Sequence, residues 1–173
     1  ASEKVNIAFT YNSSENQAEE TLNEIKKFGV QAKAYKLDIS KFNETQDVLQ
    51  KIYKDFGNID ILINNAGFTK IKKFLETNID DWNKQIDISL KGTIYCCHLV
   101  SKKMINNQDG RIINIVGDSS RIGEANLAIT AAARGGTIAL GKSLAKEFGR
   151  YSITVNTISL AVSYTHLTLP TNA

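Results

Sequence analysis

Short apolar runs alternate with amphipathic segments along most of the chain. The run at 7–11 is followed by polar residues at 12–14 and then by a segment whose apolar residues recur every three or four positions. These recurring residues are Ala18, Leu22, Ile25 and Phe28. The pattern predicts a strand, a polar helix cap and a helix with one apolar face. Gly29 follows the last apolar position, where it suits the left-handed end of a helix.

The same alternation continues to residue 158 and predicts four more strands. The predicted strands are 31–37, 59–63, 111–116 and 153–158, and the predicted helices are 40–56, 80–105 and 128–148. Ser40 is the expected cap of the first of these helices, and Gly57 is its expected end. The result is an α/β fold: a Rossmann-type, doubly wound, mostly parallel sheet with helices on both faces. An all-helical bundle would leave the β-branched runs at 59–63 and 112–116 unexplained.

The pattern stops after Leu160. Residues 162–171 resemble one reading frame of a transposon-end adapter used in sequencing libraries. We therefore expect 1–160 to form a partial Rossmann-type domain and 161–173 to be a non-native tail, in which His166 has no function. A natural coil tail is the alternative.

Composition restricts the function classes. The chain has 173 residues, of which 42% are apolar, and its 21 basic and 18 acidic residues are interspersed, so a net charge of +3 predicts neither a nucleic-acid partner nor a membrane partner. No apolar stretch approaches the ~20 residues of a membrane-spanning helix, and no secretory signal is visible. Cys96 and Cys97 adjoin in a predicted helix, which is a poor arrangement for a disulfide and favours a reducing, cytoplasmic location.

Ligands of an open α/β sheet bind beyond the carboxyl ends of its strands. The segment Asn64-Asn65-Ala66-Gly67 follows the third predicted strand, and its small residues allow a flat ligand to approach the backbone. By itself this segment could also be a turn that only ends a strand.

An ordered series of short motifs sharpens this interpretation. The series is Asp38-Ile39-Ser40, 60–67, Leu90-Lys91-Gly92-Thr93, 110–115, 143–148 and 153–156. At these separations it resembles the short-chain dehydrogenase/reductase family, and within it the 3-oxoacyl-acyl-carrier-protein reductases, over about residues 4–160. The resemblance implies an oxidoreductase that transfers hydride between a nicotinamide dinucleotide and a small-molecule or carrier-bound carbonyl or alcohol. It also implies a homodimer or homotetramer, paired through the helices at about 81–105 and 128–148.

The resemblance also assigns cofactor contacts. Carried over by position, the contacts to the adenine and its ribose are Asp38, Ile39, Asn64, Ala66 and Gly67. For Asp38 the alternative is a carboxylate that merely flanks a helix. The strand at 7–11 ends in Thr10 and Tyr11, without an acidic residue that would hold both ribose hydroxyls and repel a ribose phosphate. NADP(H) is therefore expected rather than NAD(H).

Four catalytic positions of the family carry other residue types here. Aligned through 143–147, Thr130 stands at the tyrosine, Arg134 at the lysine and Gly117 at the serine; aligned through 90–92, Ser89 stands at the asparagine. An aliphatic alcohol has a far higher pKa than a phenol, near 10, so Thr130 cannot be the same general acid.

The other substitutions differ in severity. Arg134 keeps a cation that could contact the nicotinamide ribose, although its fork is not an ammonium group. Gly117 has no hydroxyl, and on an extended chain Ser119 and Ser120 would lie several ångströms away. Two hypotheses follow: an NAD(P)-dependent oxidoreductase, or a catalytically inactive module for dinucleotide binding or oligomer interaction.

The resemblance further places an opening strand and a glycine-rich phosphate loop before Lys4, and substrate-covering helices after Ser159. Because the chain supplies neither, we expect a truncated domain with a break in the sheet between the strands at 7–11 and 59–63.

Other reactive side chains have simpler interpretations. Cys96 and Cys97 are expected to pack within a helix, and His98 to lie on a helix surface without the further ligands of a metal site, so no metal is predicted. The lysines Lys70, Lys72 and Lys73 are expected in a solvated loop, and the alternative is that they attract phosphate or an acidic carrier protein.

Overall fold

The computed structural model describes residues 2–160, so the predicted tail 161–173, with His166, lies outside the described residues. The strands are β1 (Ile7–Tyr11), β2 (Ala32–Lys36), β3 (Ile61–Asn64), β4 (Gly110–Gly117) and β5 (Ile153–Leu160). The α-helices are α1 (Glu15–Lys26), α2 (Phe42–Phe56), α3 (Ile79–Ile86), α4 (Gly92–Asn107), α5 (Ser119–Ile122) and α6 (Ala128–Phe148). Two 3-10 turns, Phe74–Glu76 and Gly149–Tyr151, and a π-helical turn, Asp87–Lys91, complete the described elements.

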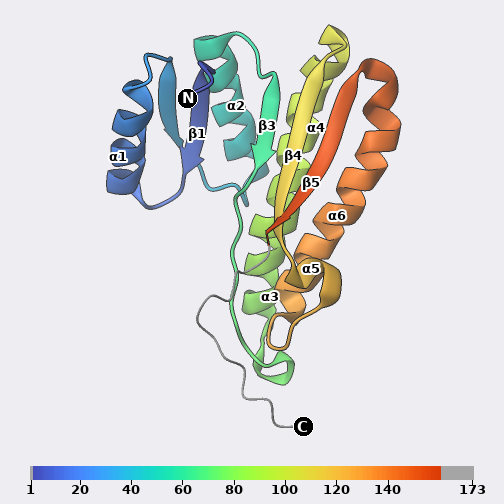
Figure 1. Cartoon of the computed structure of the whole chain (residues 1–173). Helices are drawn as coiled ribbons and strands as arrows, with labels where there is room; N and C mark the ends of the chain where they lie inside the picture. The colour runs from blue at the N-terminus through green and yellow to red at the C-terminus, as the bar shows by residue number, and fades with distance from the viewer. Residues whose placement is uncertain (1, 161–173) are drawn as a thin grey trace.

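All paired strands are parallel, with helices on both sides, which confirms the predicted α/β fold. The strands form two separate sheets, β1-β2 and β3-β4-β5 (Figure 1). Within the described residues no ladder of hydrogen bonds joins β1 to β3. The predicted break in the sheet is therefore confirmed at its predicted place.

Two helix ends and the start of α1 were predicted well, and the start of α2 was not. Gly29 and Gly57 adopt the positive φ angles of +70° and +80° and follow the ends of α1 and α2. Ser14 occupies the N-cap of α1 without a side-chain cap bond, and α2 begins after Lys41, not Ser40. The expectation for Ser40 was wrong because its hydroxyl donates to Asp38 Oδ1 instead, at 2.6 Å.

The predicted helix at 80–105 is divided. It consists of α3, the π-helical turn and α4, because the ladder of hydrogen bonds widens over Asp87–Lys91. Such π-helical turns occur frequently at functional sites.

The helix α4 joins the two sheets through one shared core. Its buried residues Cys97, Val100 and Met104 belong to the same apolar cluster as Leu49 and Ile52 of α2. The cluster also includes residues of β2, β4, β5 and α6: Tyr35, Ile112, Ile153, Val155 and Phe148. Side-chain packing between α2 and α4 therefore connects the two sheets where backbone hydrogen bonds do not.

The two faces of the β3-β4-β5 sheet differ. Ile112 and Val116 of β4 are buried on the face that packs against α4 and α6. Ile61 and Ile63 of β3 are 48% and 58% exposed on the other face. Parallel sheets are normally covered on both faces, so this face presents an unusual amount of aliphatic surface.

We expect Ile52→Ala to lower the free energy of unfolding by about 2–5 kcal/mol, because it leaves a cavity between α2 and α4. Ile71→Ala is the matched control, since Ile71 is 74% exposed, and it should change the free energy by less than about 0.5 kcal/mol. Urea unfolding followed by circular dichroism measures both. Equal effects of the two variants would contradict the proposed role of the shared core.

Candidate active site

The carboxyl ends of β3, β4 and β5 meet at the end of the structure where α3 and α5 lie (Figure 1). Arg134 of α6 joins two of these strand ends. Its Nη1 donates to the carbonyl oxygen of Ile115 at 2.9 Å, and its Nη2 donates to that of Ala66 at 3.1 Å. A Cβ at Gly67 would stand 1.7 Å from Nη2, so the guanidinium lies directly on the glycine backbone.

Burial lowers the pKa of Arg134 from its ordinary value. Within the described residues no carboxylate forms an ion pair with it. The structure thus brings Arg134, Ala66 and Gly67 together and leaves a cation with unused donors at the ends of β3 and β4.

Thr130 is turned into the protein interior. It is 6% exposed, and its hydroxyl donates to Oε1 of Gln85 at 2.5 Å. Gln85 is 1% exposed, and the same oxygen accepts the backbone amide of Lys70 at 3.3 Å. The hydroxyl at the tyrosine position therefore fixes α6 to α3 and to the loop after β3.

Ser89 lies in the π-helical turn and holds the same loop. Its hydroxyl accepts from the amide of Phe68 at 3.1 Å and donates to the Phe68 carbonyl oxygen at 3.3 Å. The carbonyl oxygen of Ser89 accepts from the Thr137 hydroxyl of α6 at 3.2 Å. Ser89 is fully buried, so its contacts position backbone and not a ligand.

Gly117 lies close to a hydroxyl after all. A Cβ at Gly117 would stand 3.6 Å from Oγ of Ser119, and Ser120 donates to the Gly117 carbonyl oxygen. On an extended chain Ser119 would lie several ångströms from position 117, but the turn into α5 folds Ser119 back.

Asp38 and Ile39 lie after the end of β2. The carboxylate of Asp38 accepts from the hydroxyl and the amide of Ser40, and the hydroxyl contact is the main reason that its pKa is lowered. Ile39 packs on Gly92, where a Cβ would come within 2.9 Å of the Ile39 side chain. Glycine at the start of α4 thus allows the loop after β2 to approach.

Asn64 is 4% exposed and directs its side chain inward. Its Nδ2 donates to Oδ1 of Asn114 at 2.9 Å and to Sγ of Cys97 at 3.3 Å. A ligand would therefore meet the backbone of Asn64 and not its amide group.

Cys96 and Cys97 of α4 are both buried, which fits the expectation that they pack within the helix. Burial is the main cause that raises the pKa of Cys96 to about 12 and that of Cys97 to about 11. Both thiols are therefore protonated near neutral pH, and His98 is exposed on the helix.

The end of β1 combines hydroxyl groups with two nearby acids, Glu15 and Glu19. Thr10 and Tyr11 are followed by a shallow hollow that residues 13–17 line at the start of α1. Partial burial, and after it the Glu15 carboxylate, raises the pKa of Tyr11. The strand itself has no acidic residue, but carboxylates of the next helix lie near its end.

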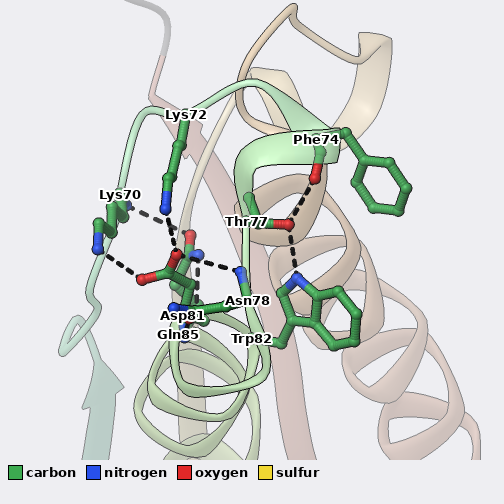
Figure 2. A network of polar contacts seen from close by, with 8 residues as sticks. All are labelled: Lys70, Lys72, Phe74, Thr77, Asn78, Asp81, Trp82 and Gln85. Atoms are coloured by element: carbon green, nitrogen blue, oxygen red, sulfur yellow. Dashed lines mark hydrogen bonds and ion pairs between the residues drawn. The ribbon is translucent and has the colours of Figure 1, made fainter.

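Sequence reasoning missed a charged cluster beside the site. Asp81 of α3 is almost buried, and its carboxylate accepts from Nζ of Lys70 at 2.5 Å and of Lys72 at 3.0 Å (Figure 2). Asn78 and Asp81 also form a reciprocal capping box at the start of α3. Lys70 and Lys72 lie in a loop, as expected, with side chains 48% and 28% exposed, but their pairing with Asp81 was not predicted. The spacing Asn78-x-x-Asp81 could have predicted the capping box from the sequence, but not the contacts with the lysines.

The cluster predicts an acid-dependent loss of stability. The hydrogen bond from Lys70, followed by that from Lys72, lowers the pKa of Asp81 to about 2, below its unfolded value of about 3.9. The stabilisation is therefore present above about pH 3.9 and disappears as the pH falls toward 2. Urea unfolding between these pH values measures the effect, and the free energy of unfolding of Asp81→Asn should depend less on pH than that of the wild type.

Asp80→Asn is the matched control, because Asp80 is the exposed neighbour on the same helix. If the free energy of unfolding changed equally with pH in the wild type and in Asp81→Asn, the Asp81 contacts would not stabilise the fold.

Two further features are absent from residues 2–160. There is no group of three or more His, Cys, Asp or Glu side chains placed to bind a metal, and no helix there is long and apolar enough to cross a bilayer.

Comparisons with known proteins place this geometry in a family. The family profile described as short chain dehydrogenase matches residues 1–173. A 3-oxoacyl-(acyl-carrier-protein) reductase of Staphylococcus epidermidis is 35% identical over 162 residues, which cover 92% of this chain and 65% of that protein. A 2-dehydro-3-deoxy-D-gluconate 5-dehydrogenase of Formosa agariphila is 35% identical over 164 residues, covering 95% and 62%.

The fold comparison agrees. A crystal structure of NAD+-bound xylitol dehydrogenase superposes with a TM-score of 0.88 at 28% identity, covering 92% of this chain and 62% of that one. The chain spans about two thirds of the length of the relatives it matches, 65% in the first case. The predicted resemblance to oxidoreductases of this type is confirmed, and the chain belongs to the short-chain dehydrogenase family.

Proposed function

We propose that this chain binds a nicotinamide dinucleotide, NADP(H) in preference to NAD(H), and that it lacks the family's usual proton donor to the carbonyl oxygen, so that hydride transfer is not completed. The observation that carries the proposal is the Thr130 hydroxyl, which is buried and donates to Gln85. An aliphatic alcohol in this setting does not protonate a substrate carbonyl near neutral pH.

The proposed cofactor site uses backbone more than side chains. Ala66 and Gly67 present small surfaces at the end of β3, and Asp38 and Ile39 lie at the end of β2, where the resemblance puts the adenine. When bound, the nicotinamide supplies or accepts hydride. Arg134 supplies a cation where the resemblance places the nicotinamide ribose, but two of the Arg134 donors already bind carbonyl oxygens.

The preference for NADP(H) rests on the end of β1. Thr10 and Tyr11 carry no charge, and the hollow at 13–17 offers hydroxyl groups and the free amides of the α1 start to a ribose phosphate. Glu15 opposes this preference, because its carboxylate is close enough to affect Tyr11. Binding measurements with both cofactors decide between these two influences.

The second candidate is an active carbonyl reductase acting on a small-molecule or carrier-bound substrate. The position of Ser119 favours it, since its hydroxyl lies 3.6 Å from the Cβ position of Gly117 and could polarise a carbonyl. Under both candidates we place the protein in the cytoplasm, where its two thiols stay reduced, and in a homo-oligomer paired through α4 and α6.

Fluorescence titration of the chain with NADPH and NADH tests the cofactor proposal, and nicotinamide absorbance with a panel of 3-oxoacyl thioesters and ketones tests turnover. We expect tighter binding of NADPH and no turnover above the uncatalysed rate. Turnover by the wild type would favour the second candidate, and the absence of binding would reject the cofactor site.

A variant with the family's catalytic residue types tests whether the fold still positions those residues for catalysis. Thr130→Tyr together with Arg134→Lys, Gly117→Ser and Ser89→Asn returns the family's residue types at all four positions. In a chain that binds NADPH, we expect this variant to gain turnover. The matched control keeps Thr130→Tyr, Gly117→Ser and Ser89→Asn but carries Arg134→Met, and it should stay inactive because the phenol then lacks the cation that lowers its pKa.

A further inference from the structure

The segment 66–72, which follows β3, is held along one edge of its backbone. The residues whose backbone groups form hydrogen bonds alternate along the segment and are Ala66, Phe68, Lys70 and Lys72. No hydrogen bond within residues 2–160 uses the backbone of Gly67 or Thr69. Such alternation is typical of an extended chain, in which successive residues direct their N–H and C=O groups to opposite sides. The edge at Gly67 and Thr69 is therefore not used by any other described element.

Side chains from three elements hold the used edge. Arg134 of α6 and Ser89 of the π-helical turn bind its first part. The third side chain is Gln85 of α3, whose Oε1 accepts the amide of Lys70 at 3.3 Å. Gln85 lies outside the motifs that carry the family resemblance, so the resemblance implies no role for it.

The hydrogen bonds of Gln85 fix the orientation of its amide group. Its Nε2 donates to the carbonyl oxygen of Asp81 at 3.0 Å, so its Oε1 is directed away from that carbonyl. This oxygen accepts from the Lys70 amide and, at 2.5 Å, from the Thr130 hydroxyl. A backbone N–H can only donate, so only the oxygen of the Gln85 amide suits Lys70. Gln85 is 1% exposed, and burial of such a polar group is costly unless it has hydrogen-bond partners.

Gln85 also connects the segment to α6. Its oxygen is shared between the Lys70 amide and the Thr130 hydroxyl, and Arg134, one turn after Thr130, binds the start of the segment. The segment is thus fixed to α6 directly at Ala66 and through Gln85 at Lys70. The ion pair of the Lys70 ammonium group holds only a side chain that is 48% exposed. The position of the Lys70 amide therefore depends on Gln85.

We propose that Gln85 is a positioning residue of the dinucleotide site: its side-chain oxygen fixes the backbone of 66–70 so that the unused edge at Gly67 and Thr69 stays available to the ligand. This role rests on the proposed function, because Ala66 and Gly67 belong to the proposed cofactor site. Gln85 itself touches no ligand, since it is buried. The property that matters is an acceptor oxygen at this position and not the volume of the side chain.

Fluorescence titration with NADPH tests this role in three variants. Gln85→Met keeps the length of the side chain but lacks the oxygen, and it should weaken NADPH binding at least tenfold. Gln85→Glu keeps an acceptor oxygen and should stay within threefold of the wild type. Asn83→Met is the matched control, because Asn83 is exposed on the same helix, and it should leave binding unchanged. A role in packing alone would predict the opposite order for the two Gln85 variants, because Met is apolar and Glu buries an acid.

Amide hydrogen exchange measured by nuclear magnetic resonance tests the contact without a ligand. Relative to their rates in an unfolded chain, the Lys70 amide of the wild type should exchange at least tenfold more slowly than the Thr69 amide, which has no partner within residues 2–160. The Lys70 amide should lose this protection in Gln85→Met and keep it in Gln85→Glu. The comparison within the wild type holds even if a variant does not fold.

Three results would overturn the role of Gln85. They are equal NADPH binding by Gln85→Met and the wild type, equally weak binding by both Gln85 variants, and equal protection of the Lys70 and Thr69 amides in the wild type. Absence of NADPH binding by the wild type would instead reject the proposed function. The exchange rates would then decide on their own whether Gln85 fixes the loop.

Discussion

The packing of α2 against α4 is the contact on which the rest of the molecule depends. The β1-β2 and β3-β4-β5 sheets share no ladder of hydrogen bonds, so their relative position is set by side chains of one apolar core. That position determines how far the end of β2 lies from the end of β3. The Asp38 and Gly67 parts of the proposed cofactor site are therefore aligned by helix packing, which is less directional than a strand pairing.

The candidate site is built largely from helix α6 reaching back to the strand ends. Thr130, Arg134 and Thr137 stand on successive turns of this helix and bind, in order, α3, the ends of β3 and β4, and the π-helical turn. Side chains that could face a ligand are instead used to hold the site together.

The sequence predicted the elements much better than the contacts of the site. Period-three-and-four and β-branched patterns report burial, and burial fixes where strands and helices lie. The partner of Thr130 could not be predicted, because Gln85 is 45 residues away and reaches it only in the folded chain. The same holds for Asp81 and its lysines and for Ser119 beside Gly117, where a turn brings together groups that an extended chain keeps apart.

The division of the sheet also has a dynamic consequence. Strands joined by a continuous ladder open as one cooperative unit, whereas β1 and β2 with α1 can lose their contacts while β3, β4 and β5 keep theirs. Backbone amides of the two sheets would then exchange with solvent from two different open states. The proposed cofactor site takes residues from the ends of both sheets, so a bound dinucleotide would stabilise the molecule by holding the two sheets together in addition to their shared core.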